Sequence, residues 1–181
     1  MSVIAVSGHM VDSPDRPRPR FPPDQVPRVE AEVRSALDGW DVGPGTTVVS
    51  GGARGADVIA GEQALARGAR VKLVLALPPD EFERRSVALS GTDWAARFRR
   101  LLQHAEVEVV GSRGDADDVF ECANTRIIEV ARALGGGRPR ALVVWDGNAG
   151  DGPGGTSDFV ERLGYDALDE NVRVIDPTPP G

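Results

Sequence analysis

The stretch Thr46–Leu65 decides the fold, and it reads Thr-Thr-Val-Val-Ser-Gly-Gly-Ala-Arg-Gly-Ala-Asp-Val-Ile-Ala-Gly-Glu-Gln-Ala-Leu. Its first four residues, 46–49, are β-branched, which predicts a buried strand. The next three residues, Ser50 to Gly52, interrupt that run. Apolar residues then recur at roughly helical spacing over 56–67, which predicts a helix. A strand that passes through glycines into a helix is typical of Rossmann-like domains.

The turn between this strand and this helix has the features of an anion-binding site. Glycine lets backbone N–H groups approach a ligand closely, and the start of a helix adds unpaired donors and a partial positive charge. The candidate ligand-binding residues in the turn are Gly51, Gly52, Arg54, Gly55 and Asp57. Arg54 can pair with a phosphate or a surface carboxylate, and Asp57 can bind a ribose or stabilise the helix start. The run matches neither G-x-G-x-x-G nor the P-loop, so a tight turn without a ligand stays an alternative.

The rest of the chain alternates between strand and helix patterns. Short apolar runs predict strands over 3–6, 71–77, 107–110, 141–145 and 172–175, besides 46–49. Amphipathic patterns predict helices over 25–40, 94–105 and 119–134. A last helix follows, for which Thr156, Ser157 and Asp158 are all good N-caps, and Asp158 has capping-box spacing with Glu161. Residues 80–92 are polar and predict an irregular segment. The fold class that follows is α/β: one three-layer Rossmann-like domain over 1–176, with a mainly parallel sheet of about six strands flanked by helices, and a disordered tail over 177–181.

Three glycine-bearing turns follow predicted strands, namely 7–9, 50–55 and 146–158. The carboxyl ends of parallel strands lie at one edge of a sheet, so we expect these turns to converge there on a phosphate. The ligand-binding candidates outside the central turn are Ser7, Gly8, His9, Arg20, Asn124, Gly154, Gly155 and Thr156. Packing or capping roles remain alternatives for His9, Asn124 and Thr156. Asp146, which ends a strand, is a candidate ribose ligand or catalytic carboxylate.

A proline-rich segment, 11–23, follows the first of these turns and carries Arg16, Arg18 and Arg20. Prolines at that density exclude a helix and favour an extended, stiff path. The segment is therefore either a solvated loop or a lid over the mouth of the pocket. In the second case its arginines would face the anionic oxygens of a ligand.

Composition and charge exclude several classes of partner. The formal net charge is −7 with a pI of about 4.9, which disfavours general binding to nucleic acid or to anionic membranes. Cys122 is the only cysteine, so a reducing compartment fits best. No apolar run approaches a membrane span and the first ten residues do not form a signal peptide, so we expect a cytoplasmic domain. His9, His104 and Cys122 have no metal-ligand spacing. We therefore expect neither a metal nor another cofactor.

Several segments resemble a known superfamily. The run 48–57, Val-Val-Ser-Gly-Gly-Ala-Arg-Gly-Ala-Asp, resembles the Ser-Gly-Gly-Ala-x-Gly-x-Asp turn of DprA-type proteins, and 152–156 resembles the Pro-Gly-Gly-x-Gly-Thr loop of the LOG phosphoribohydrolases. Both belong to the SLOG superfamily of Rossmann-like nucleotide-handling domains. A closer resemblance is to the SLOG-like modules that accompany tetratricopeptide repeats or nucleotide cyclase domains in bacteria. The segments similar to those modules are 8–12, 19–22, 120–124, 145–147 and 154–156.

The resemblance implies a module that binds a nucleotide or nucleotide derivative and passes a signal to an effector protein, and it also implies a homodimer. An alternative is a LOG-like hydrolase of the N-glycosidic bond of nucleoside monophosphates, with Asp146, Asp158 or Glu161 as the carboxylate. Aligning Gly155-Thr156 with the family motif puts Phe159 where the family has its glutamate, so enzymatic activity stays open. A second alternative is DprA-like binding of single-stranded DNA by the arginines at 16–20 and 97–100, against which the acidic balance argues.

Overall fold

The computed structural model describes residues 2–111, 118–148, 155–165 and 169–179, and these form a single α/β domain with a six-stranded parallel sheet. The strands are β1 (Ser2–Gly8), β2 (Thr46–Ser50), β3 (Arg70–Leu75), β4 (Glu106–Val109), β5 (Arg140–Val144) and β6 (Val172–Ile175). Their order in the sheet is β4-β3-β2-β1-β5-β6, and every neighbouring pair is parallel. The predicted fold class, a three-layer Rossmann-like domain, is confirmed.

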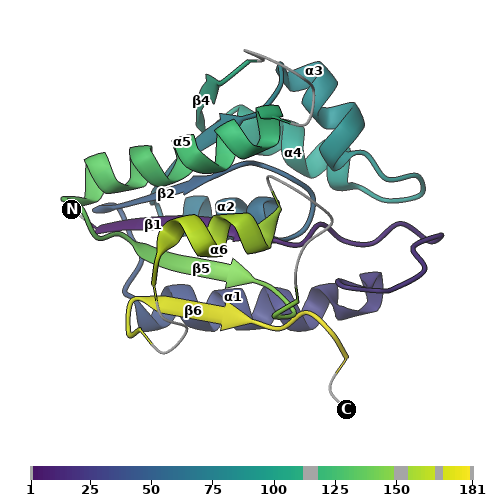
Figure 1. The fold of residues 1–181 in the computed structure, drawn as a ribbon, viewed down its shortest axis with the longest axis horizontal. Helices are drawn as coiled ribbons and strands as arrows, with labels where there is room; N and C mark the ends of the chain where they lie inside the picture. The colour runs from purple at the N-terminus through teal and green to yellow at the C-terminus, as the bar shows by residue number, and fades with distance from the viewer. Residues whose placement is uncertain (1, 112–117, 149–154, 166–168, 180–181) are drawn as a thin grey trace.

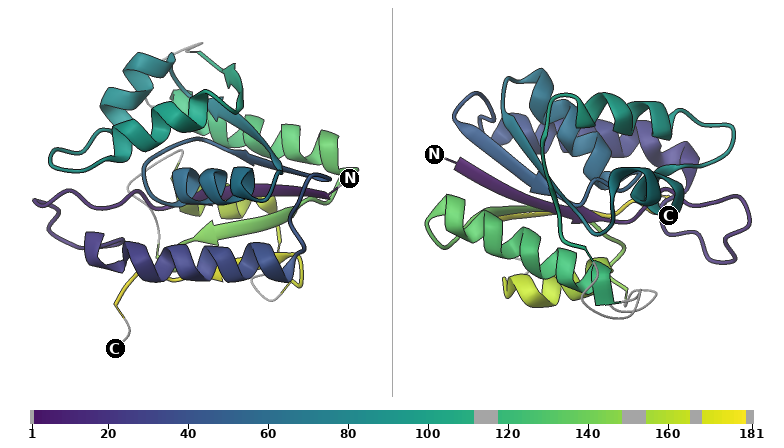
Figure 2. Two further views of the ribbon diagram at one scale, coloured as in Figure 1. Left: turned by 180° about the vertical axis from the view of Figure 1, so that it is seen from behind. Right: turned by 90° about the horizontal axis from the view of Figure 1, so that it is seen from above.

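Helices cover both faces of the sheet (Figures 1 and 2). The longer helices are α1 (Val26–Gly39), α2 (Ala56–Ala66), α4 (Trp94–Leu102), α5 (Asp118–Gly135) and α6 (Thr156–Leu163). The view from above in Figure 2 places α1, α2 and α4 on one side of the strands and α5 with α6 on the other. Each face therefore contributes its own hydrophobic core.

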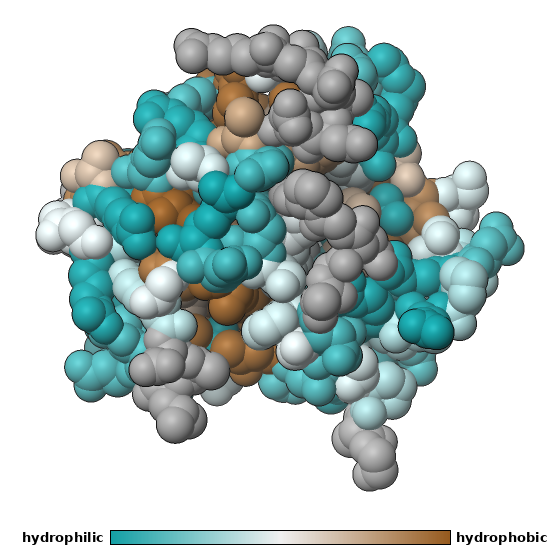
Figure 3. Space-filling model, in the orientation of Figure 1, coloured by the Kyte–Doolittle hydropathy of each residue, from teal (hydrophilic) through white to brown (hydrophobic). Residues whose placement is uncertain are grey.

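The side-chain alternation of the strands explains these two cores. In β1, Ile4 and Val6 pack with α1 and α2, whereas Val3 and Ala5 pack against the face covered by α5 and α6. Successive side chains of a strand point to opposite faces, so a strand buried on both faces must be apolar at nearly every position. The continuous apolar runs of the sequence reflect this double burial. The surface over α5 and α6 is largely hydrophilic, with apolar areas between polar side chains (Figure 3).

Two segments differ from the sequence-based expectation. Residues 80–92 were expected to be irregular, but they begin with a short helix, α3 (Pro79–Phe82), that continues into a π-helical turn over Glu83–Val87. The last helix was expected to have Thr156, Ser157 or Asp158 as its N-cap, but α6 begins at Thr156 with Gly155 as its N-cap, and Asp158 lies in its first turn, where it accepts from Asn124 and Arg162. The first difference matters for the site, since a π-helical turn is frequently found at functional sites.

The segment after β6 is attached to α1. Arg28 in α1 donates to the carbonyl oxygens of Asp176 and Thr178, which holds the segment after β6 against this helix.

Among the described residues, no helix combines the length and apolar character needed to cross a membrane.

Candidate functional site

The cavity of interest lies at the edge where the strands end. The chain continues from β1 to β2 on one side and reaches β5 on the other, so the strand order reverses beside β1. Ligands in sheets of this type bind outside the carboxyl ends of the strands at such a reversal. A cavity of about 380 Å³ is found there. It is lined by nine of the predicted site residues: Ser7, Gly8, His9, Arg20, Gly51, Asp57, Asn124, Gly155 and Thr156.

A chain of hydrogen bonds runs from Asp146, after β5, through His9, after β1, to Thr156 at the start of α6. His9 Nε2 lies 2.9 Å from Asp146 Oδ1, and His9 Nδ1 lies 3.4 Å from Thr156 Oγ1. An ionised carboxylate only accepts hydrogen bonds, so His9 carries its proton on Nε2 and the Thr156 hydroxyl donates to Nδ1. Burial lowers the pKa of His9, against the opposing effect of the bond to Asp146, so the imidazole is neutral at pH 7. The His9 ring thus joins the turn after β1 to residues that are 137 and 147 positions away in sequence.

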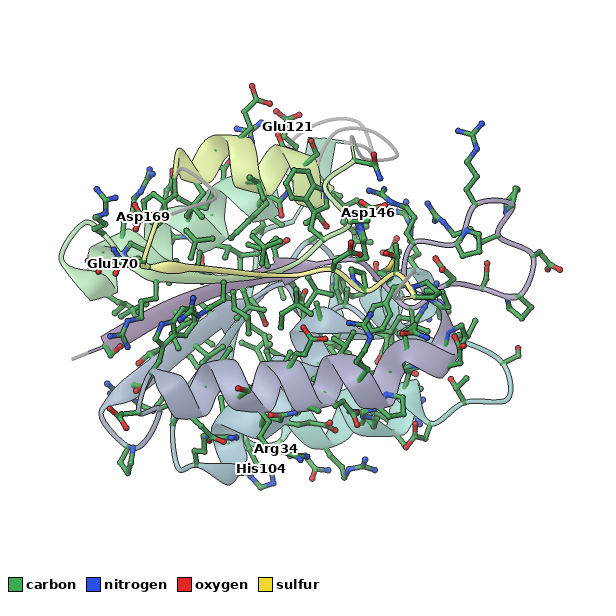
Figure 4. All side chains as sticks on the ribbon, turned by 90° about the horizontal axis from the view of Figure 1, so that it is seen from below. Arg34, His104, Glu121, Asp146, Asp169 and Glu170 are labelled. Atoms are coloured by element: carbon green, nitrogen blue, oxygen red, sulfur yellow. The ribbon has the colours of Figure 1, made fainter. Side chains whose placement is uncertain are left out.

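Asp146 is held in place by Arg20, which belongs to the proline-rich segment. Arg20 Nε donates to Asp146 Oδ2 at 3.2 Å, and Nη2 donates to Oδ1 at 3.0 Å. Burial alone would raise the pKa of Asp146, but the hydrogen bonds from Arg20, His9 and Asn148 outweigh it and keep that pKa well below its usual range. Figure 4 shows Asp146 at the edge where the strands end. Asp146 is therefore an ionised support for His9 and Arg20 in the cavity wall, while its own side chain is not part of the lining.

The proline-rich segment returns to the domain through Asp12. The Asp12 Oδ2 atom accepts the backbone N–H groups of Arg20 and Phe21, each at 2.8 Å, and Phe21 is fully buried. This closes the segment into a loop beside the cavity. Arg16 and Arg20 line the cavity, whereas Arg18 is exposed. The structure contains one conformation of this loop, so movement of the loop as a lid stays a prediction.

The glycine turn after β2 binds a group of the protein itself. Asp57 Oδ2 accepts the N–H of Ala53 at 3.1 Å, and hydrogen bonds from the amides of Gly51 and Gly52 also act on this carboxyl group. Burial, the larger effect, raises the pKa of Asp57 to about 7 against these bonds. Asp57 Oδ1 has no hydrogen-bond partner among the described residues. The amides that the sequence offers to a phosphate are thus directed at an internal carboxyl group.

Three other residues of this turn support neighbouring structure. Arg54 Nε donates to the Val11 carbonyl at 2.8 Å, and Arg54 is not among the residues that line the cavity. Gly52 and Gly55 have φ angles of +81° and +99°. A Cβ on Gly52 would lie against Leu75 and Phe98, and one on Gly55 would lie 2.7 Å from the His9 carbonyl oxygen. The β2 turn therefore packs closely against the core and against the loop after β1, with space only for glycine at these two positions.

The predicted polar residues of α5 and α6 are placed differently from one another. Asn124 lines the cavity, and its Nδ2 donates to the Gly155 carbonyl and to Asp158 Oδ2, each at 3.1 Å. Asp158 also accepts from Arg162 Nε at 2.7 Å, and Glu161 is exposed. Asp158 and Glu161 are not among the lining residues. Gly154 lies outside the described residues.

The cavity also contains residues that the sequence analysis did not name as site candidates. These are chiefly Asp12, Phe82, Arg85, Ser86 and Phe120. Phe82, Arg85 and Ser86 come from α3 and the π-helical turn, which the polar pattern of 80–92 did not predict. Asp12 and Phe120 lie inside segments 8–12 and 120–124, where the resemblance was the available signal.

The cavity wall holds several arginines, although the chain is acidic overall. Among the described residues, Arg16, Arg20 and Arg85 line the cavity together with Asp12 and Asp57; Arg16 is paired with Asp12, and Arg20 with Asp146 behind the wall. Burial raises the pKa of Asp57 to about 7, so this carboxyl group is partly protonated near pH 7. The start of α6 adds a partial positive charge, which Asp158 in its first turn offsets in part, and its N-cap Gly155 has no side chain to bond the first N–H groups. No cluster of three or more metal-ligating side chains occurs in the described part of the chain.

The fold and the position of this cavity define a Rossmann-like α/β domain with a site at the carboxyl edge of its sheet. The structure of DNA processing protein A (DprA) from Streptococcus pneumoniae is similar, with a TM-score of 0.52 and 18% identity over 90% of this chain. The chain spans 46% of the length of that DprA chain, and the likeness is one of fold. The structure of TM1055 has a TM-score of 0.46 and 15% identity, covering 90% of this chain and 68% of that one. No family model matches the sequence, and no curated protein matches it.

Proposed function

We propose that the chain is a nucleotide-binding module of the sensor or signalling type, which holds the phosphate of a nucleotide or nucleotide derivative between the β1 turn and the start of α6. The observation that carries the proposal is the cavity wall itself, which brings Thr156, His9 and Arg20 together at a helix start whose N-cap residue, Gly155, has no side chain to cap it. A phosphate is favoured at a helix N-terminus by the N–H donors and by the helix dipole. The arginines add charge-assisted hydrogen bonds.

Within this proposal, the phosphate binds at the start of α6 and not at the β2 turn. The β2 turn is satisfied by Asp57, so a second anion there would lie beside the carboxyl group that already accepts its amides. No internal carboxyl group is directed at the start of α6 in the same way among the described residues that line the cavity. The His9 N–H in the β1 turn bonds to the Val144 carbonyl, whereas Gly155 and Thr156 at the start of α6 line the cavity. We therefore place the phosphate beside Thr156 rather than beside Arg54.

Isothermal titration calorimetry with AMP, ADP-ribose and inorganic phosphate tests this proposal. Thr156→Val removes the hydroxyl at nearly constant shape. On binding, this hydroxyl has to turn from His9 Nδ1 to the phosphate, and we expect its loss to weaken each phosphate-bearing ligand about tenfold, as for one hydrogen bond to a charged group. Thr92→Val is the matched control, because Thr92 lies in an exposed loop and bonds only locally to the Leu89 carbonyl. Absence of any heat or melting-temperature change with all three ligands would exclude the proposal.

A second candidate function is hydrolysis of the N-glycosidic bond of a nucleoside monophosphate. The observation in its favour is His9, a neutral imidazole positioned by Asp146 in the cavity wall, which has the arrangement of a general base. Asp158 and Glu161 support this function less well, since one is bonded to Arg162 and Asn124 and the other is exposed. Release of free adenine from AMP, lost in His9→Gln, would establish it; intact AMP after prolonged incubation would exclude it.

Binding of single-stranded DNA is the weaker alternative, raised by the fold shared with DprA. The arginines of α4 are largely engaged in ion pairs, because Arg97 pairs with Glu30 and Glu62, and Arg99 pairs with Glu83. Neutralised side chains contribute little to the release of counterions from DNA. A gel shift that weakens with salt would revive this alternative.

A further inference from the structure

The cavity has two chemically different parts. Thr156 and Arg20 contribute polar groups from the side of β1 and β5. Residues that follow β3 or belong to α5 contribute a largely apolar part, which includes Phe82, Phe120 and Ile127. Because β3 and β5 lie on opposite sides of β1 in the sheet, these parts occupy different ends of the cavity. A ligand that fills both ends must therefore carry an anionic group and an apolar group.

Phe120 in α5 and Arg85 in the π-helical turn form a pair at the apolar end. The Arg85 guanidinium carbon lies 5.5 Å from the centroid of the Phe120 ring. For comparison, Arg97 lies 4.3 Å above Trp94 and is fixed by two ion pairs. The Arg85 side chain is 42% exposed, and its ion pair with Glu81 is 4.0 Å long. The guanidinium is thus loosely placed over an aromatic face that is only partly buried.

We propose that Phe120 and Arg85 form the subsite for the aromatic base of the ligand, with the base stacked on the Phe120 ring and the guanidinium plane on its other face. The inference rests on the proposed nucleotide-binding function. Aromatic rings and arginine planes are the groups that stack on bases, and the interaction tolerates any base because each has a π-face. A base can enter between the Phe120 ring and the Arg85 guanidinium if the Arg85 side chain moves away from the ring. Its ion pair with Glu81, which is 4.0 Å long, restrains that movement only weakly.

The chemistry of the two ends fits a nucleotide better than a sugar phosphate or a free anion. A sugar phosphate has no group for the apolar end, and inorganic phosphate would use the Thr156 end alone. Phe82 and Ile127 line the same cavity as the partly buried Phe120, so a planar base would meet apolar side chains besides the ring on which it stacks. The base should therefore add affinity beyond that of the phosphate.

Calorimetric titration with AMP and with ribose 5-phosphate separates the base from the rest of the ligand. For the wild-type protein we expect AMP to bind about tenfold or more tightly than ribose 5-phosphate, the usual effect of stacking one base. Phe120→Leu keeps an apolar side chain without a π-face and should remove most of that difference, while the affinity for ribose 5-phosphate stays unchanged. Phe120→Trp should retain the difference.

Fluorescence supplies a second readout that a merely structural role of Phe120 would not produce. In Phe120→Trp, AMP should quench emission more than in the wild type, whose own tryptophans provide the background, and ribose 5-phosphate should not. Equal affinity of the wild type for AMP and ribose 5-phosphate, or full retention of the AMP preference in Phe120→Leu, overturns the base subsite and leaves the nucleotide site intact. Binding of neither ligand refutes the proposed function, and the base subsite with it.

Discussion

Two turns of similar sequence type, the β1 turn (Ser7–His9) and the β2 turn (Ser50–Gly55), end at the same edge of the sheet but have different roles. The β2 turn directs its amides at Asp57, which is buried and has a raised pKa. The β1 turn contributes His9, whose partner Asp146 has a lowered pKa because Arg20 and His9 bond to it. A glycine-rich strand-to-helix turn therefore does not by itself indicate a bound anion. What distinguishes the two turns is whether an internal carboxyl group already occupies the donors.

The largest effect that can test this comparison is the pH dependence of stability caused by Asp57. Its pKa is about 7 in the folded protein against an ordinary value of 3.8, so the folded state binds the proton more tightly than the unfolded state. The stabilising contribution is complete below pH 4 and is lost as the pH rises to 7, by up to about 4 kcal/mol. Asp57→Asn should remove this loss. The unfolding free energy of the variant minus that of the wild type should therefore increase from pH 4 to pH 8.

Urea denaturation at several pH values measures that difference. His9 acts in the opposite direction, since its folded pKa is lowered and its contribution to stability increases as the pH rises towards 6.5. Comparison with Asp57→Asn cancels this contribution, because His9 is present in both proteins. A stability difference that does not vary with pH would mean that Asp57 is ionised in the folded state, and that the two turns are electrostatically alike.

The second prediction concerns the packing of the two turns. A Cβ on Gly8 would lie 2.5 Å from Ala56 Cβ and 2.8 Å from the Val144 carbonyl oxygen, both of which are fixed by the sheet and by α2. Gly8→Ala should therefore destabilise the protein by roughly 3 kcal/mol. A Cβ on Gly51 meets Asp57 Oδ2 at 3.2 Å, so Gly51→Ala should cost less, about 1 kcal/mol.

Gly45→Ala is the control for both variants, because a Cβ there has no neighbour within 4 Å among the described residues. Thermal and urea unfolding of the three variants would give the ranking. If Gly8→Ala were as well tolerated as Gly45→Ala, the close approach of the β1 turn to α2 and β5 would be wrong.

The sequence was sufficient to predict the layers of the fold, because they follow from local patterns. Apolar runs such as Val71–Leu77 indicated strands buried on both faces, and parallel strands necessarily bring their following turns to one edge. The bounds of most elements agree within one or two residues. The exceptions are α3 with the π-helical turn, where Phe82 and Val87 are buried within a segment of polar sequence. A polar pattern does not reveal two apolar residues that are buried by long-range contacts.

The details of the site depended on contacts that the sequence does not encode locally. The direction of the Arg54 side chain depends on Val11, 43 residues earlier, so a basic residue in the turn could not be distinguished from a phosphate ligand. The role of Asp57 had a local signal, a carboxylate four residues after Ala53, because such spacing lets a side chain turn back to the turn amides. Asp146 and His9 are paired only through the adjacency of β5 and β1, which the order of elements alone did not reveal.

The smallest expected effect concerns the β1 turn, where the pKa of His9 depends on Asp146. The hydrogen bond and the negative charge of Asp146 both raise the pKa of His9, against burial and Arg20, which lower it. Asp146→Asn keeps a side chain of similar shape but removes the charge, so the pKa of His9 should fall further. NMR titration of the imidazole resonances measures this directly, with His104, which Figure 4 places well away from Asp146, as the reference signal. A rise in the pKa of His9 in this variant would contradict this account, because it would mean that Asp146 does not favour the protonated imidazole.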